Sequence, residues 1–284
     1  MGKATGFLEF DRVLPQKEAV ENRKQNYQEF VHPYSENQLN NQAARCMNCG
    51  IPFCHSGCPL GNVIPEFNDA VYDGKWQEAY NILSSTNNFP EFTGRICPAP
   101  CESACVLGIN KNPVAIEEIE KHIIEIAYKK GYVKPNKSAI KTGKKVAVVG
   151  AGPAGLAAAA QLNKAGHDVV VYERDDKVGG LLRYGIPDFK LDKLVIDRRI
   201  EIMKESGIEF RTNAEVGKNV PASELDQYDA VVLSVGSTIP RNLNIPGREL
   251  KGVYYAMEFL KQQNQRVGNS PIEVEEILAT GKNV

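Results

Sequence analysis

All seven cysteines of this 284-residue sequence lie in two short blocks within its first 105 positions. The first block reads Cys46-x2-Cys49-x4-Cys54-x3-Cys58-Pro59, and the second reads Cys97-x3-Cys101-x3-Cys105. Thiolates at such short spacings can converge on one metal centre from one loop or from successive helical turns. An odd number of cysteines without a secretory signal argues against a disulfide framework. The expected chemistry is therefore ligation of a metal or a cluster.

The Cys-x3-Cys-Pro ending of the first block is typical of ferredoxin-type runs, in which the fourth cysteine serves the other of two clusters. On this pattern Cys46, Cys49 and Cys54 hold one [4Fe-4S] cluster. Cys58 then joins the second block on the other cluster. One cysteine of the second block, with Cys105 as the candidate, crosses back to complete the first cluster.

Two four-iron clusters with four ligands each need one ligand more than seven cysteines supply. Glu120 is the candidate because it lies on the helix predicted after the second block, and a solvated surface residue is the alternative. His55 is a further candidate, although a place beside the cluster or at the surface is favoured. Zinc is the main rival, but seven sulfurs do not divide into closed all-cysteine zinc sites without a spare.

A glycine fingerprint, Gly150-Ala151-Gly152-Pro153-Ala154-Gly155, follows an apolar strand and opens an Ala-rich helix. Gly150 permits the tight turn, Gly152 lets the backbone approach a pyrophosphate, and Gly155 lets the helix pack close to the sheet. The helix N-terminus offers free N–H groups to phosphates. Glu173 ends the second strand, where an acidic side chain accepts from ribose hydroxyls. Together these features predict a dinucleotide site.

Glu173 would repel a 2′-phosphate, which disfavours NADP at this site and leaves FAD and NAD open. Residues 178–187 (VGGLLRYGIP) look like the FAD-side continuation of two-dinucleotide flavoproteins, and residues 235–238 (VGST) resemble their strand-end motif. Each glycine segment alone is also compatible with a plain turn. The candidate cofactor-binding residues are Gly150, Gly152, Pro153, Ala154, Gly155, Glu173, Arg174, Gly180, Leu181, Arg183, Val216 and Gly236.

The hydrophobic period changes along the chain, and this change predicts two domains. Apolar residues at helical spacing predict helices over Asp73–Leu83 and Val114–Tyr128, beside the cysteine loops. From Lys145 a strand, a helix and a second strand form a βαβ unit, and Ala230–Val235 reads as a later strand. We therefore expect an α/β chain. Residues 1–135 form an all-α domain with two [4Fe-4S] clusters, 136–144 a linker, and 145–284 an incomplete, Rossmann-like FAD-binding domain with a parallel sheet.

Composition is ordinary for a globular protein, with 42% hydrophobic and 24% charged residues. A net charge of -1 gives no sign of a nucleic-acid or membrane partner. The first residues, Met1 to Asp11, lack a basic segment followed by an apolar one, so no secretory signal is expected. These features predict a cytoplasmic location.

Four segments resemble the glutamate synthase small (β) subunit family. They are residues 1–12 (MGKATGFLEFDR), 46–54 (CMNCGIPFC), 87–102 (NNFPEFTGRICPAPCE) and 185–191 (GIPDFKL). The resemblance extends over essentially the whole chain, and related modules occur in dihydropyrimidine dehydrogenase and in transhydrogenase-type ferredoxin–NADP reductase. The dihydropyrimidine dehydrogenase module has a glutamine ligand at about the position of Glu120.

The resemblance implies a path for electrons. NADPH reduces FAD, and the clusters pass single electrons to the large (α) subunit, which makes glutamate from glutamine and 2-oxoglutarate. It also implies a hetero-oligomer and no catalytic acid or base in this chain. Family members continue into a second Rossmann domain that binds NADPH, and this sequence has no second fingerprint, so we expect a truncated chain. The alternatives are a stand-alone iron–sulfur/FAD electron-transfer module, a transhydrogenase-type reductase subunit and a zinc-stabilised interaction protein.

Overall fold

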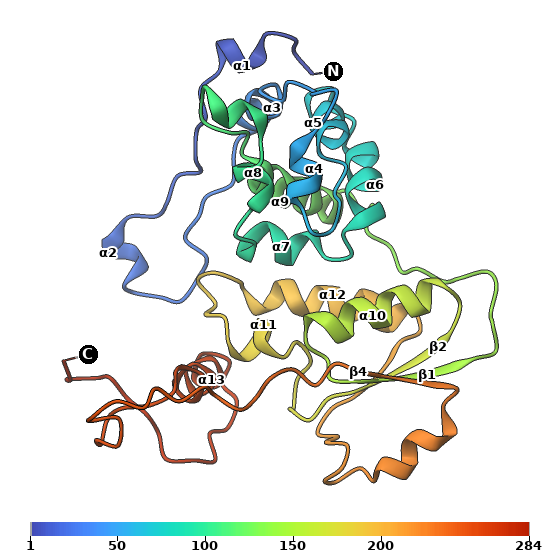
Figure 1. The fold of residues 1–284 in the computed structure, drawn as a ribbon, viewed down its shortest axis with the longest axis vertical. Coiled ribbons are helices and arrows are strands. Elements are labelled where there is room, and N and C mark those ends of the chain that lie inside the picture. The colour runs from blue at the N-terminus through green and yellow to red at the C-terminus, as the bar shows by residue number, and fades with distance from the viewer. Residues whose placement is uncertain (1, 284) are drawn as a thin grey trace. The chain divides into compact units, whose positions relative to one another are not determined.

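The computed structural model describes residues 2–283, and the chain divides into two compact units. The helical unit contains Met1–Asn26 and Phe30–Lys134, and the sheet unit contains Tyr27–Glu29 and Pro135–Val284. Figure 1 shows the helices of the first unit and the parallel sheet of the second. The predicted fold class, a helical domain followed by a Rossmann-like parallel sheet, is confirmed.

The helical unit consists of five longer helices joined by shorter ones. The longer helices are α3 (Glu36–Ala43), α5 (Ile64–Tyr72), α6 (Trp76–Thr86), α7 (Pro90–Ile96) and α9 (Ile116–Lys129). The shorter elements are α1 (Gly6–Glu9), α2 (Val20–Arg23), α4 (Phe53–Gly57), α8 (Pro100–Ser103) and the 3-10 helix η1 (Val106–Ile109). The two helices predicted from periodicity are confirmed as α6 and α9. α6 begins at Trp76 rather than Asp73 because Gly74, with a positive φ of 71°, lies between it and α5.

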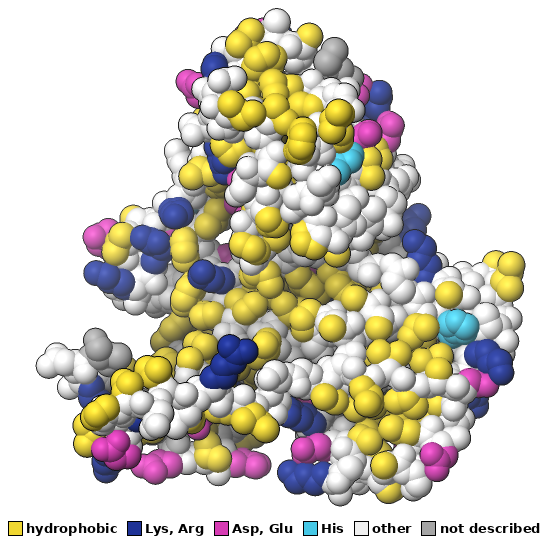
Figure 2. Space-filling model, viewed as in Figure 1, with side chains coloured by type: hydrophobic (Ala, Val, Ile, Leu, Met, Phe, Trp, Pro, Cys, Tyr) yellow, Lys and Arg dark blue, Asp and Glu magenta, His cyan; other side chains and the backbone are white. Residues whose placement is uncertain are grey.

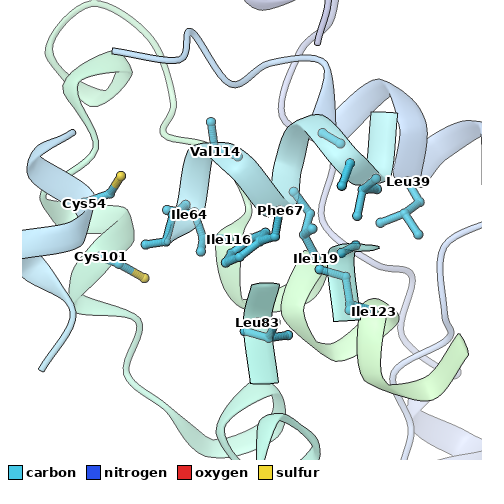
Figure 3. Packing of buried hydrophobic residues seen from close by; sticks show 14 of the residues in the cluster. Leu39, Cys54, Ile64, Phe67, Leu83, Cys101, Val114, Ile116, Ile119 and Ile123 are labelled. Carbon is cyan, nitrogen blue, oxygen red and sulfur yellow. The ribbon is translucent and has the colours of Figure 1, made fainter. Parts of the chain in front are cut away.

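Local sequence sets where these helices begin. Ser35 forms a capping box with Gln38 at the start of α3, and proline occupies the first turn of α5, α7 and α8. One stripe of α9, with Ile116, Ile119 and Ile123, is fully buried against Phe67 and Leu83 (Figure 3). This apolar stripe anchors α9, the helix that carries Glu120.

α7 and α9 approach each other closely at Gly94. A Cβ atom at this position would lie 2.9 Å from the Cα and Cβ atoms of Lys121 on α9. Contacts this short force the backbone to shift. The glycine therefore fixes the distance between α9 and the segment that leads into Cys97.

The sheet unit is built on four parallel strands in the order β3-β2-β1-β4. These are β1 (Lys145–Val149), β2 (Asp168–Tyr172), β3 (Glu209–Arg211) and β4 (Ala230–Leu233). The helices are α10 (Pro153–Lys164), α11 (Leu181–Tyr184), α12 (Lys193–Glu205) and α13 (Ala256–Val267), with the 3-10 helix η2 (Ala222–Gln227). The predicted βαβ unit is confirmed as β1, α10 and β2. Residues 132–144 form no helix or strand.

We expect Gly94→Ala to destabilise the helical unit by about 1–3 kcal/mol, because the added methyl group overpacks the contact between α7 and α9. Gly108→Ala is the matched control, since the nearest atom to its Cβ would be 3.8 Å away. Chemical denaturation of both variants measures the difference. Equal free energies of unfolding would show that the close approach is not constraining.

Candidate functional site

Four cysteines from both sequence blocks surround one cavity in the helical unit. Cys46 and Cys49 lie between α3 and α4, Cys54 lies in α4, and Cys105 directly precedes η1. We call these four residues the first ligand group. The structure therefore brings Cys105 to the cysteines of the first block rather than to those of its own block. Buried apolar residues and Asn68 of α5 complete the cavity wall.

The second ligand group consists of Cys58, Cys97, Cys101 and Glu120. Burial raises the pKa of Cys101, and the nearby Glu120, Cys58 and Cys97 raise it further. The pKa of Cys97 is raised in the same way, with Glu120 and Cys58 again among its neighbours. Cys58, Cys97 and Glu120 thus all lie near enough to Cys101 to raise the pKa of its thiol, as does Glu102.

α4 and α8 bring Cys58 and Cys101 close together because Gly57 has no side chain. A Cβ atom on Gly57 would lie 2.5 Å from that of Ala104, just after α8. Figure 3 shows Cys54 and Cys101 on the two neighbouring segments. The close packing of these two short helices thus positions cysteines from both ligand groups.

Burial raises the pKa of the Cys46 and Cys54 thiols, so both are protonated at neutral pH in the absence of a metal. It raises the pKa of Cys46 to about 11 and that of Cys54 to about 12, from an ordinary value of 9.0. Backbone N–H groups of Asn48 and His55 partly oppose this effect at Cys46 and Cys54. Because thiolates are the metal-binding form, ligation must displace these protons.

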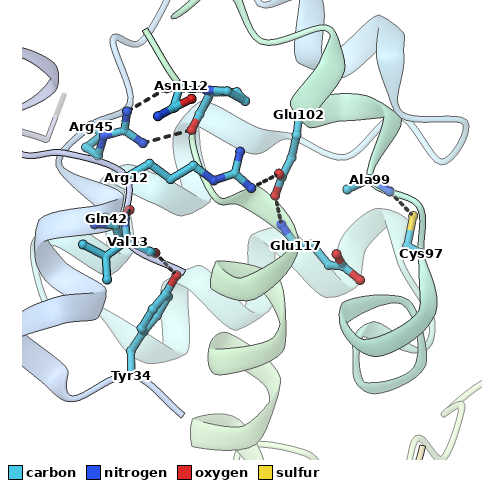
Figure 4. A network of polar contacts seen from close by, with 11 residues as sticks. Arg12, Val13, Tyr34, Gln42, Arg45, Cys97, Ala99, Glu102, Asn112 and Glu117 are labelled. Carbon is cyan, nitrogen blue, oxygen red and sulfur yellow. Dashed lines mark hydrogen bonds and ion pairs between the residues drawn. The ribbon is translucent and has the colours of Figure 1, made fainter. Parts of the chain in front are cut away.

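The backbone of both cysteine loops turns N–H groups toward sulfur. Asn48 and Ala99 adopt the left-handed conformation, with φ of 48° and 50°. For alanine this conformation is strained. At Ala99 it accompanies a hydrogen bond from the backbone N–H to Cys97 Sγ at 3.4 Å (Figure 4). Such N–H···S contacts tune the potentials of iron–sulfur clusters, so both loops suit a cluster.

Glu120 is buried on α9, with 6% of its surface exposed. Its Oε1 accepts a hydrogen bond of 2.9 Å from Asn62 Nδ2, and Asn62 Oδ1 accepts one of 2.7 Å from Thr86. Burial raises the pKa of Glu120 to about 7. Its hydrogen bond with Asn62 thus fixes the orientation of a buried carboxyl group that can lose its proton near neutral pH. The solvated alternative does not describe a side chain this deeply buried.

The His55 imidazole hydrogen-bonds to the backbone at the start of α5. Its Nε2 accepts a hydrogen bond of 2.9 Å from the backbone N–H of Ile64, the first residue of α5. His55 therefore caps a helix that lines the cavity. Within residues 2–283, no three His, Cys, Asp or Glu side chains are arranged to hold a single metal ion.

Two arginines that the sequence pattern did not single out fix the cysteine loops. Arg45, 1% exposed, directly precedes Cys46 and donates to the carbonyl oxygens of Phe10, Asn112 and Pro113 at 2.6–3.1 Å. Arg12 forms an ion pair of 2.5 Å with Glu102 beside Cys101 (Figure 4). In the sequence, Arg45 stands out only as a charged residue beside a cysteine and Arg12 does not stand out at all, because the partners of both lie far away in the chain.

The glycine fingerprint forms the floor of a second cavity, in the sheet unit. Gly150 has a φ of 102°, and a Cβ atom there would lie 2.4 Å from the Ser234 carbonyl oxygen. A Cβ on Gly155 would lie 1.9 Å from the Gly150 carbonyl oxygen, so α10 packs directly on the turn. Gly152 meets nothing within 4 Å and faces open space. Gly150 thus permits the tight turn, Gly155 the close packing of the helix on the turn, and Gly152 the approach of a pyrophosphate, as in dinucleotide-binding sites.

Glu173 lies in the same cavity, which has a volume of about 390 Å³. One of its oxygens accepts from the Ala151 N–H and the other from the Asp175 N–H, both at 2.9 Å. These bonds orient a buried carboxylate at the end of β2, where it retains free lone pairs for a ligand hydroxyl. The volume is in the range of small-molecule and cofactor sites.

Most of the predicted cofactor-binding residues line this cavity. They are Gly150, Gly152, Pro153, Ala154, Glu173, Arg174, Gly180, Leu181, Val216 and Gly236. Arg183 does not line it, because its guanidinium donates to the Val178 carbonyl oxygen and pairs with Asp197. Sequence reasoning missed Lys261 of α13, which pairs with Asp175 at 2.6 Å at the cavity wall.

Apolar side chains reach the surface of the helical unit, as the hydrophobic patches in Figure 2 illustrate. Among them, Ile51, Phe53 and Ile109 lie within four residues of a cysteine in the sequence and are 73%, 57% and 78% exposed. No helix among residues 2–283 combines the length and the apolar character that crossing a membrane would require.

Two family profiles match the chain. The one described as dihydropyrimidine dehydrogenase domain II, 4Fe-4S cluster, matches residues 23–132, and the one described as NAD(P)-binding Rossmann-like domain matches residues 148–210. The chain thus contains a 4Fe-4S cluster domain followed by a Rossmann-like NAD(P)-binding domain.

Several proteins similar to this chain are named glutamate synthase. The chain is 54% identical, over 93% of its length, to a glutamate synthase [NADPH] small chain of Mycobacterium tuberculosis. It is 48% identical, over 100% of its length, to a glutamate synthase [NADPH] small chain of Bacillus subtilis. It is 50% identical over 100% of its length to 14% of a glutamate synthase [NADH] of Schizosaccharomyces pombe. The chain spans 55% and 60% of the two bacterial relatives. The resemblance stated from the sequence is confirmed.

Cluster assembly should release protons and become more favourable as pH rises from about 7 to about 9. Because the pKa values of Cys46 and Cys54 lie above this range, each thiol gives up a proton when it binds iron, and a lower proton activity favours the bound form. Anaerobic reconstitution in weak buffer with a pH indicator measures the release. Iron uptake that does not depend on pH would contradict protonated ligands.

We expect Glu120→Ala to remove one cluster and leave the other, because Glu120 does not line the cavity of the first ligand group. Glu78→Ala on α6 is the control, since Glu78 is an exposed glutamate away from both groups. Iron content and electron paramagnetic resonance (EPR) of the reduced protein count the clusters. Two intact clusters in Glu120→Ala would rule out Glu120 as a ligand.

Proposed function

From its similarity to the N-terminal part of glutamate synthase small chains, we propose that this chain is the electron-input part of a glutamate synthase. When bound, FAD and two [4Fe-4S] clusters would carry electrons from NADPH toward a large chain that forms glutamate from glutamine and 2-oxoglutarate. NADPH itself would bind a part of the protein outside these 284 residues. The role of the present chain is to hold the redox groups and to tune them.

The observation that carries this proposal is the division of the ligand residues into two groups of four. Cys46, Cys49, Cys54 and Cys105 surround one cavity, while Cys58 and Glu120 accompany the remaining two cysteines. Each group combines residues from both sequence blocks. Two centres of four ligands each use every cysteine of the chain, which supports two clusters rather than one.

FAD is the dinucleotide that best suits the cavity of the sheet unit. The Glu173 carboxylate would repel a 2′-phosphate and accept from a free ribose hydroxyl, which argues against NADPH at this position. Gly180 supports the cofactor site from the other side, because a Cβ atom there would lie 2.8 Å from the Gly152 Cα. The two glycine segments therefore converge where a pyrophosphate would lie.

A protein partner is supported by the apolar surface near the ligands. Ile51, Phe53 and Ile109 are exposed close in sequence to cysteines of the first group. Exposed apolar side chains beside a redox centre favour docking of another protein over free solvent. In this proposal the large chain of the synthase receives electrons from the helical unit.

Anaerobic purification of the chain tests the proposal directly. We expect brown protein with about eight iron and eight sulfide per chain and one FAD. Zinc without sulfide would establish the rival zinc-stabilised protein. Clusters without affinity for the large chain would instead support a stand-alone electron carrier.

The flavin has its own test. We expect Gly152→Ala to weaken FAD binding by more than about tenfold, since its methyl group enters the space reserved for the pyrophosphate. The flavin-free variant should melt at the temperature of the flavin-free wild type, because the methyl group meets no protein atom within 4 Å. Unchanged affinity for FAD would place the cofactor elsewhere.

A further inference from the structure

Asn68 on α5 is a polar residue at a position that the helix pattern reserves for apolar ones. Ile64, Phe67 and Val71 of the same helix are at most 1% exposed and form the stripe that faces the core. Asn68 belongs to this stripe and is 0% exposed. A polar side chain at a core position of a helix requires a partner.

The Cys46 sulfur is the one neighbour with which the Asn68 amide has a recorded interaction among residues 2–283. Neither Nδ2 nor Oδ1 of Asn68 makes a hydrogen bond of normal geometry to any residue among 2–283. Burying an amide without hydrogen bonds is unfavourable, and a leucine would fill the same place without this penalty. The side chain is instead oriented toward the Cys46 sulfur and the cavity that both residues line.

The cavity of the first ligand group lies in front of this amide. Asn68 lines it together with Cys46, Cys49, Cys54 and Cys105. The amide lies beside the Cys46 sulfur and, like the backbone N–H of Asn48, favours its thiolate form. Of the side chains that line this cavity, Asn68 alone offers amide N–H groups.

We propose that Asn68 donates a hydrogen bond to the sulfur of the cluster held by the first ligand group and thereby sets that cluster's reduction potential. The inference rests on the proposed function, because it requires the cluster. A hydrogen bond to sulfur stabilises the more negative, reduced form and so raises the potential. Asn68 is thus a positioning and tuning residue that binds no iron itself.

The test is a redox titration of the purified, cluster-loaded chain, followed by EPR. We expect Asn68→Leu, which fills the same volume without a donor, to keep both clusters and to shift the potential of one of them downward. Ile64→Val is the control, because it alters the packing of the same cavity without changing its donors. The potential of the other cluster should stay unchanged in both variants.

A second measurement uses the wild-type protein and does not depend on the stability of a variant. Asparagine labelled with nitrogen-15 only in its side chain should give a nitrogen coupling to one reduced cluster in pulsed EPR. An absent coupling, or unshifted potentials in an Asn68→Leu protein that holds both clusters, would overturn the inference. Wild-type protein without any cluster would instead refute the proposed function, so the two failures are distinguishable.

Discussion

The helical unit is organised around thiols and a carboxyl group that are removed from water and can ionise only against a positive charge. Burial raises the pKa of Cys46, Cys54 and Cys101, so these thiols are neutral at pH 7 without a metal, and it raises the pKa of Glu120 to about 7. Bound iron would reverse this preference, because thiolates and carboxylates are its ligands. Burial therefore opposes ionisation of the ligands in the metal-free site, and it would strengthen their attraction to bound iron.

The rest of the helical unit supports this arrangement. Arg45 ties the residue before Cys46 to three carbonyl oxygens, and the apolar stripe of α9 places Glu120 beside the second block. Gly57 and Gly94 let neighbouring helices approach more closely than any side chain would allow. In the sheet unit, glycines play the corresponding role, since Gly150 and Gly155 bring strand, turn and helix together around an open cavity.

The sequence alone was sufficient for features with a local cause. Periodicity predicted α9 and the βαβ unit because burial along one face repeats with the helix or strand. Ferredoxin-type spacing suggested that Cys105 leaves its own block, and the structure places it with Cys46. Arg45, Asn68 and Lys261 could not be recognised in this way, since their roles depend on partners distant in the chain. Arg183 shows the converse, because it lies within a cofactor-like segment yet packs against Val178 and Asp197.

The exchange of cysteines between the two blocks has a consequence for how the helical unit folds. Cys58 joins the later block and Cys105 the earlier one, so each centre closes a long loop of the chain. Neither centre can be completed while the other segment is still unfolded. In the proposed two-cluster protein, iron binding and folding of this unit would therefore be coupled.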